Sequence, residues 1–404
     1  MRLILTISVL VAAVIAQQEV EQLDNLFTEA NNRFTARMFS EVVKGNPDKS
    51  VVLSAFSVLT PLAQLSLASE GESHDELLKA VGLPDDNAIK SVFPRLNDKL
   101  RNVKGIELRS VSKIYVAEHY ELNPEFSAVT RDIFNSEVKN VDFNMNEETA
   151  KEINTWVEEQ TNNHIKDIVA ANYLRPDYRS ILVNAIYFKG KWNSPFDNKN
   201  TKEEDFHVSK DKTIKVPMMH KRGKFRYADS DELNAELLEL PYEGREASFI
   251  VILPKEVDGL AALIEKLKDP SALELAISRM STFEVDVSMP KFTIETETDL
   301  GSVLQNCIYF ICSQMDVKRI FHATQAKLNR LLKTDELLYL SKATQKAFIE
   351  VNEEGAEATA ANPFEVLFMR AQLRTPQATF RADRAFIFLL REHQNTIFNG
   401  VFIS

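Results

Sequence analysis

The chain has 404 residues, which is enough for one large domain or two ordinary ones. Its formal net charge of −11 opposes nonspecific binding to nucleic acid. Only 11 glycines are present, which argues against glycine-rich phosphate loops and repeat architectures.

The first sixteen residues read MRLILTISVLVAAVIA. A charged residue, Arg2, precedes an apolar run over residues 3–14, and small residues follow. This order is typical of a secretory signal peptide, and the run is too short to span a bilayer. We therefore expect a signal peptide over residues 1–16, a secreted mature chain from Gln17, and no membrane anchor.

Helices are expected to dominate the first half of the chain. Apolar residues recur at helical spacing between Leu23 and Val42. Thr60-Pro61 suits the start of a second helix, and residues 75–81 followed by Gly82 suit a short helix with a glycine stop. A longer helix is expected from Asn146.

Strands are expected to dominate the second half. Residues 181–188 are almost all apolar or β-forming, which predicts a buried central strand, and residues 248–253 are similar. Residues 283–289 alternate between apolar and polar, which favours a half-buried antiparallel strand. Residues 386–390 and 397–403 are two more strands. No linker rich in Pro, Gly or Ser separates the halves, so one α+β domain is predicted.

The sequence lacks the motifs of the common enzyme classes. No G-x-S-x-G elbow, H-E-x-x-H, phosphate-binding loop or dinucleotide fingerprint occurs, and the seven histidines have no metal-ligand spacing. His164 and His393 are interpreted as structural or surface residues. Cys307 and Cys312, the two cysteines, match neither zinc nor redox spacing; they either pair locally or stay free thiols. We expect no catalysis, no cofactor and no metal.

Eight short motifs, in a fixed order, resemble those of the serpin family. They are NAIYFKGKW at 184–192, LPY at 240–242, ILP at 252–254, PKF at 290–292, DL at 299–300, KAFIEVNEEG at 346–355, FRAD at 380–383 and FNG at 398–400. Each motif alone is weak, but the ordered set is highly specific. The resemblance covers about residues 23–404, and its style is similar to that of insect hemolymph serpins.

The resemblance implies one α+β serpin domain over residues 17–404. It implies about three β-sheets, about nine helices and an exposed reactive loop at about residues 353–379. In this family a serine protease cleaves the loop and forms an acyl-enzyme, and the loop then inserts into a sheet and traps the protease. The implied partner is a serine protease in a covalent complex. A monomer is expected, with neither nucleic acid nor membrane as a partner.

The resemblance assigns a hinge to the segment that would insert. Its residues are Glu353, Glu354, Gly355, Ala356, Glu357, Ala358, Thr359, Ala360 and Ala361. Gly355 supplies a residue that can turn, and with period two the alanines 356, 358 and 360 would face the core with little steric resistance. On composition alone the segment could equally be helix or linker. The family also implies an ion pair between Lys291 and Glu353 that restrains premature insertion.

The resemblance places the scissile bond between Met369 and Arg370. Methionine on the acyl side suits elastase-like or chymotrypsin-like proteases. A shift of one residue, to Arg370-Ala371, would suit trypsin-like proteases, and Arg374 is a third choice. A non-inhibitory binding or storage protein is the second reading of the chain, and inhibition of cysteine proteases is a third.

Three features depart from the family pattern. Pro363 would enter a central strand, where a residue without an N–H is poorly tolerated. Gln345 stands where many serpins carry a histidine, and an amide can still form hydrogen bonds. Residues 306–313 are about eight extra apolar residues, either a hydrophobic insertion that contacts a partner or retained noncoding sequence.

Overall fold

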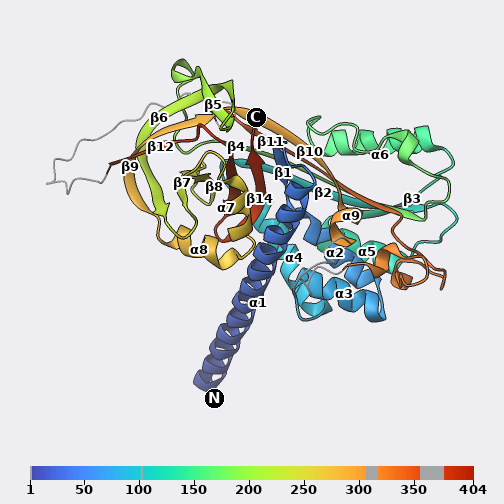
Figure 1. Cartoon of the computed structure of the whole chain (residues 1–404). Helices are drawn as coiled ribbons and strands as arrows, with labels where there is room; N and C mark the ends of the chain where they lie inside the picture. The colour runs from blue at the N-terminus through green and yellow to red at the C-terminus, as the bar shows by residue number, and fades with distance from the viewer. Residues whose placement is uncertain (1, 102, 306–316, 355–376) are drawn as a thin grey trace.

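Two β-sheets and the helices around them form the part of the chain that the computed structural model describes, residues 2–101, 103–305, 317–354 and 377–404 (Figure 1). Within it are the nine expected α-helices. They are α1 (Arg2–Lys44), α2 (Ala55–Ala68), α3 (Gly71–Val81), α4 (Asp86–Arg101), α5 (Pro124–Phe134), α6 (Asn146–Gln160), α7 (Leu260–Lys266), α8 (Pro270–Ser278) and α9 (Leu300–Gln305). The prediction of a mixed α+β fold is confirmed.

The first sheet has five strands. In spatial order they are β10 (Phe292–Asp299), β11 (Lys342–Val351), β4 (Ser180–Gly190), β2 (Ile106–Ala117) and β3 (Glu137–Val141). Strands β11 and β4 are parallel, and so are β2 and β3. Strand β10 is antiparallel to β11, and β2 is antiparallel to β4. The predicted buried central strand is therefore confirmed as β4.

Strand β4 is mostly apolar because both of its faces are covered. Tyr187 stacks on the ring of His164, which follows α6, and the next residue, Phe188, contacts Phe398 on the opposite face. Figure 1 shows α6 on one side of this sheet and α2, α3 and α5 on the other. Such a strand reads as a continuous apolar run rather than an alternating one.

The second sheet has nine strands. Its path is β1 (Val51–Leu53), β14 (Asn395–Phe402), β13 (Phe386–Glu392), β8 (Ala247–Pro254), β7 (Ala235–Pro241), β6 (Lys212–Ser230), β9 (Ser281–Pro290) and β12 (Gln377–Arg381), and β5 (Lys202–Ser209) also pairs with β6. About three sheets were expected, and the described residues form two hydrogen-bonded sheets. The reason is β6, whose nineteen residues pair with β5 over 212–218, with β9 over 218–227 and with β7 over 226–230. This one long strand joins what would otherwise be two sheets.

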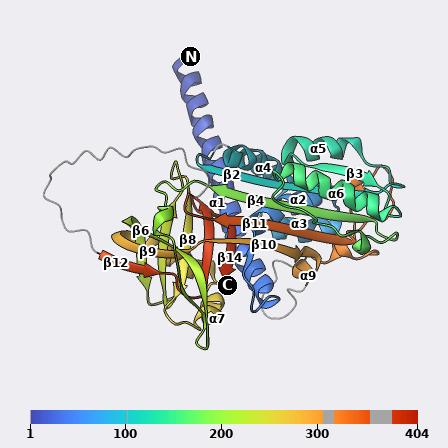
Figure 2. The ribbon, with the colours of Figure 1, turned by 90° about the horizontal axis from the view of Figure 1, so that it is seen from above.

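The two sheets divide the molecule. In Figure 2 the strands of the five-stranded sheet run side by side in the right part, and the nine-stranded sheet occupies the left part. A cluster of aromatic rings joins them, including the contacts of Phe292 on β10 with Phe386 and Phe402 of the second sheet. This shared core holds the end of β10 against β13 and β14.

Helix α1 continues through the expected cleavage site after Ala16. Its amino-terminal end projects from the rest of the molecule (Figure 1). Val14 is 54% exposed, and Phe27 is the first of its described side chains to be buried. Among the described helices, none combines the length and the apolar character needed to cross a membrane.

Helix α2 begins earlier than expected. The prediction of a start at Thr60-Pro61 is wrong, because Ser54 caps the helix by accepting a hydrogen bond from the backbone N–H of Ser57. Pro61 therefore lies inside the helix, where it cannot donate to the carbonyl of Ser57. The side-chain amide of Asn184 on β4 donates to that carbonyl instead, at 3.2 Å.

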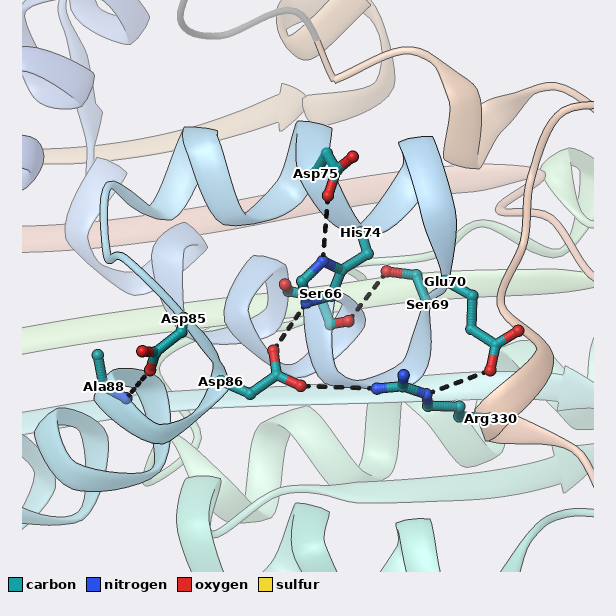
Figure 3. Close-up of polar contacts among 9 residues, drawn as sticks. All are labelled: Ser66, Ser69, Glu70, His74, Asp75, Asp85, Asp86, Ala88 and Arg330. Atoms are coloured by element: carbon teal, nitrogen blue, oxygen red, sulfur yellow. Dashed lines mark hydrogen bonds and ion pairs between the residues drawn. The ribbon is translucent and has the colours of Figure 1, made fainter.

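A polar cluster joins α3, the start of α4 and the short helix η4 (Asn329–Leu331), as Figure 3 shows. The Nε2 atom of His74 lies 2.7 Å from a carboxylate oxygen of Asp86. Arg330 on η4 reaches both Asp86, at 3.5 Å, and Glu70, at 3.4 Å. The connection between α9 and β11 is thereby tied to the helical layer beneath the five-stranded sheet.

Candidate functional site

The candidate site begins where the chain leaves the five-stranded sheet at the end of β11. Three hydrogen bonds from the segment after β4 hold this exit. The indole N–H of Trp192 donates to the carbonyl of Asn352 at 2.8 Å, the N–H of Phe196 donates to Glu353 at 2.7 Å, and the N–H of Trp192 donates to Glu354 at 3.3 Å. The first two predicted hinge residues, Glu353 and Glu354, are therefore fixed by their backbone.

The side chain of Glu353 is also held. It is 6% exposed, and its carboxylate accepts from Lys291 Nζ at 2.9 Å and from the hydroxyl of Thr201 at 2.8 Å. Burial raises the pKa of Glu353, but the hydrogen bonds from Lys291 and Thr201 outweigh burial, so the net pKa lies below its ordinary value of 4.5. The carboxylate is consequently charged at neutral pH and accepts two side-chain hydrogen bonds.

Residues 355–376 of the predicted loop lie outside the described residues, whereas the last predicted loop residues, 377–379, belong to strand β12. Residues 355–376 include the hinge residues from Gly355 to Ala361, Pro363, and Met369 and Arg370 at the expected scissile bond. The cysteines and the extra segment at 306–313 also lie outside the described residues. The described structure fixes both ends of the loop, at Glu354 and at Gln377.

The exit of β11 leads to a pair of parallel strands. Strands β11 and β4 pair directly over eight residue positions, from Lys342 opposite Ile181 to Ile349 opposite Phe188. A strand that entered between them would have to separate this pairing along its whole length. The two strands are thus the element on which any insertion depends.

A buried polar cluster joins the middle of these strands to the start of α2. The amide nitrogen of Gln345 on β11 lies 2.8 Å from the carbonyl of Ser54, 2.8 Å from Asn184 Oδ1 and 2.9 Å from the hydroxyl of Ser57. Its amide oxygen accepts from the N–H of Ser54 at 3.3 Å. Gln345 and Asn184 have no exposed surface, so these bonds are shielded from water.

Sequence reasoning missed most of this cluster. The signal was present, because Asn184 opens the NAIYFKGKW motif, which also ends in Trp192. Ser54 and Ser57 occur in a short SAFS segment at 54–57. The contacts join residues 288 and 291 positions apart, which no local pattern encodes.

The two singled-out histidines occupy structural positions. His164 was expected on a helix and lies in the turn after α6, where its ring stacks on Tyr187 at 4.2 Å with an interplanar angle of 7°. His393 lies in the tight turn between β13 and β14, with a positive φ of 49°. Neither residue belongs to the hinge or to the buried polar cluster around Gln345.

Comparison with known proteins gives a consistent result over the whole chain. Residues 29–404 match the family described as serpin (serine protease inhibitor). Antichymotrypsin-2 of Bombyx mori is 54% identical over 383 residues, which cover 95% of this chain and 99% of that protein. Antitrypsin of Bombyx mori is 52% identical over 392 residues, which cover 97% of each. The crystal structure of Serpin48 of Tenebrio molitor, described as highly specific, aligns with a TM-score of 0.83 at 31% identity, covering 94% of this chain and 98% of that one.

Replacing Lys291 with alanine should loosen the hinge. The substitution removes one of the two side-chain donors to Glu353, and a partly exposed pair of this kind contributes about 1 kcal/mol. On warming, spontaneous polymerisation, or spontaneous conversion to a form with the uncleaved loop inserted in the sheet, should become about fivefold faster. The rate is measured by native gel over time. Lys199→Ala, at a nearby exposed lysine, is the control, and an unchanged rate in Lys291→Ala would remove the restraining role.

The same carboxylate predicts a dependence on acid. Because the folded-state pKa of Glu353 is lowered, its contribution is complete above about pH 4.5 and is lost as the pH falls through the lowered pKa. The conversion rate should be flat between pH 7 and pH 5 and should rise below pH 4.5. Glu353→Gln should be faster at pH 7 and should lack this acid rise; an identical rise in both proteins would assign it to other groups.

Replacing Gln345 with leucine should weaken the pairing of β11 with β4. The change leaves buried polar atoms of Ser54, Ser57 and Asn184 short of a partner, at about 1–3 kcal/mol for each such group. The thermal midpoint should fall and spontaneous conversion should accelerate. Gln64→Leu is the matched control, because Gln64 is equally buried but has one hydrogen bond of 3.4 Å in the described structure. Equal losses in the two variants would contradict a special role for Gln345.

Proposed function

The chain belongs to the serpin family, and from this premise we propose that it is a secreted suicide-substrate inhibitor of serine proteases. A role as a protease inhibitor, and not as an enzyme, agrees with the names of its insect relatives. The proposed target protease cleaves the loop between Glu354 and Gln377 and is held as an acyl-enzyme. The partner would be covalent, and the inhibitor itself a monomer.

The observation that carries this proposal is the direct passage from β11 into the hinge. Strand β11 is parallel to β4, and the chain leaves β11 at the end where β4 also ends. A chain that turned back at Gly355 would run antiparallel to both strands and could bond to each. Once separated from each other, β11 and β4 would thus offer the two edges that such an insertion requires.

The proposed insertion strand has side chains that fit between covered faces. Residues 345 and 347 of β11 face the layer of α2, whereas Lys346 faces the side of α6, where it bonds the carbonyl of Lys166 at 2.5 Å. The turn at Gly355 would start a new strand, and with period two along that strand Ala356, Ala358 and Ala360 would face the interior. Alanines add little volume to a core that is already close-packed.

The proposed strand is long enough to displace a protease and to gain free energy. From Glu353 to Met369 the chain advances sixteen residues, which at about 3.3 Å per residue is about 50 Å. About ten new backbone hydrogen bonds would contribute roughly 1 kcal/mol each. The uninserted form would then be metastable, and its lifetime would be set by the rate at which β11 and β4 separate.

The proposed scissile bond is Met369-Arg370. Both Bombyx relatives are similar to nearly the same degree, although one is named for chymotrypsin and the other for trypsin. Overall identity therefore favours neither class of target, and Met369 is proposed from the distance to the hinge. A bond at Arg370-Ala371 and a trypsin-like target are the alternative.

Secretion is proposed from the signal peptide at residues 1–16. The described helix α1 agrees with its removal, because the side chains of Gln17, Gln18 and Glu19 are exposed. Phe27, the first buried one among the described side chains of α1, lies ten residues inside the proposed mature chain and contacts Phe56 and Phe93. Cleavage after Ala16 would leave this core intact.

A complex-formation experiment tests inhibition and the scissile bond together. Residues 17–404 should form a complex that survives denaturing gel electrophoresis with chymotrypsin or elastase, and mass spectrometry should find a released fragment that starts at Arg370. A fragment that starts at Ala371 would move the scissile bond and favour trypsin-like targets. Cleavage without any complex would support the non-inhibitory alternative.

A charged hinge residue provides the internal control for that experiment. Ala358→Glu would place a carboxylate on the side that faces the interior, so the variant should be cleaved without forming a complex. Glu357→Ala changes the neighbouring residue on the outer side and should still form one. A complex of normal yield with Ala358→Glu would contradict insertion of this segment.

A further inference from the structure

A basic groove lies on the nine-stranded sheet, next to the residues that hold the hinge. We define the basic groove as the cleft of about 940 Å³ whose cations are Lys221, Arg222, Lys224, Arg226 and Arg245. Two carboxylates, Glu239 and Glu284, also line it, which leaves a net charge of +3. The whole chain has a net charge of −11, so the groove is a local reversal of sign.

Strand β6 arranges these cations in a row. Arg222, Lys224 and Arg226 are exposed, and the residues between and after them, Phe225 and Tyr227, are buried. Successive side chains on one face of a strand are about 6.7 Å apart, so the three cations span about 13 Å. Because they stand on a paired strand in the interior of a sheet, their backbone positions are fixed.

Three of the five cations have no acidic partner in the part of the chain that the structure describes. Glu284 accepts from Arg222 at 3.1 Å, and Glu239 pairs with Arg226 at 2.5 Å. Glu284 lies directly opposite Lys224 in the sheet, but its carboxylate bonds to Arg222. Within the described residues, Lys224 and Arg245 have no carboxylate within 4.0 Å.

The third such cation, Lys221, forms part of the groove wall. Its amine donates to the carbonyl of Pro195 at 2.8 Å and to Ser194. Burial lowers the pKa of Lys221 to about 8, so the amine is largely charged at neutral pH. Lys221 thereby ties the row of cations on β6 to the segment that holds the hinge.

The groove lies between the two ends of the reactive loop. Trp192 lines the groove and donates its N–H to the carbonyl of Glu354, the last described residue before the loop. Glu284 also lines the groove and pairs with Gln377, the first described residue after the loop. Both anchors of the segment that carries the proposed scissile bond are therefore walls of the groove.

A protease bound at that bond would reach the groove. Met369 is eight residues from Gln377, so at most about 28 Å of chain separates them. A protease domain of roughly 200 residues has a radius of gyration of about 16 Å and a diameter of about 40 Å. The surface of the protease and the basic groove therefore come within contact range.

We propose that the basic groove is a second binding surface for the target protease, which recognises an acidic patch beside the protease active site. The proposal rests on the proposed inhibitory function and adds a determinant of specificity outside the loop. Complementary charge at such a surface raises the association rate, and arginines are enriched at protein interfaces. Proteases with the same cleavage preference would then be distinguished by the charge of their surfaces.

The test compares anionic and cationic forms of one protease that the unmodified protein traps. The groove variant is Lys224→Gln combined with Arg245→Gln, and the control is Lys79→Gln combined with Arg101→Gln, two exposed cations on α3 and α4. At low salt the groove variant should trap the anionic protease about fivefold more slowly than the control variant does. With the cationic protease the groove variant should not be slower than the control variant, because the lost cations would repel that protease, and high salt should remove the difference seen with the anionic one.

Three other results would overturn the proposal. Equal rate constants for the groove and control variants with the anionic protease would remove the second surface, while the complexes that form would still support inhibition. If heparin accelerates the unmodified protein but not the groove variant, and the two are equal without it, the groove binds a sulfated polyanion instead. Absence of any complex with the unmodified protein would overturn both the proposed function and the groove proposal.

Discussion

The pairing of β11 with β4 is the constraint on which the rest of the molecule depends. Eight parallel positions join the two strands, and the Gln345 cluster ties their middle to the start of α2. A parallel pair is slightly less stable per residue than an antiparallel pair. The buried side-chain hydrogen bonds of the Gln345 cluster therefore add to a strand pair whose backbone pairing is of the less stable kind.

The helices and strands could be predicted from sequence where the local residue pattern agrees with the environment of the element in the fold. Strand β4 could be predicted because cover on both faces makes it mostly apolar, and α3 because Gly82 ends it with a φ of 76°. The predicted start of α2 was wrong because Pro61 lies inside the helix, where the carbonyl that it leaves free accepts from Asn184, 127 positions away from Ser57. The number of sheets was wrong because the single long strand β6 pairs with strands that would otherwise belong to two sheets. Residue periodicity does not show that one strand continues from one group of partners to the next.

Prediction of the candidate site was limited in the same way, because some of its contacts join residues that are distant in the sequence. The small alternating residues after Gly355 and the pair of Lys291 with Glu353 could be proposed from motifs. The anchoring of the hinge by the backbone at Trp192 and Phe196 could not, since it depends on a turn after β4 that only the folded sheet positions. That turn also contacts Lys221, so the hinge and the basic groove share one short segment of backbone.

The proline inside α2 gives this helix an unusual place in the assembly of the molecule. An ordinary helix completes its own ladder of hydrogen bonds and can form as soon as its turns close. Helix α2 cannot, because the carbonyl of Ser57 receives its bond from a side chain of β4 rather than from residue 61. The helix reaches its full complement of bonds within the protein only once β4 lies beside it, so α2 and β4 stabilise each other through this bond.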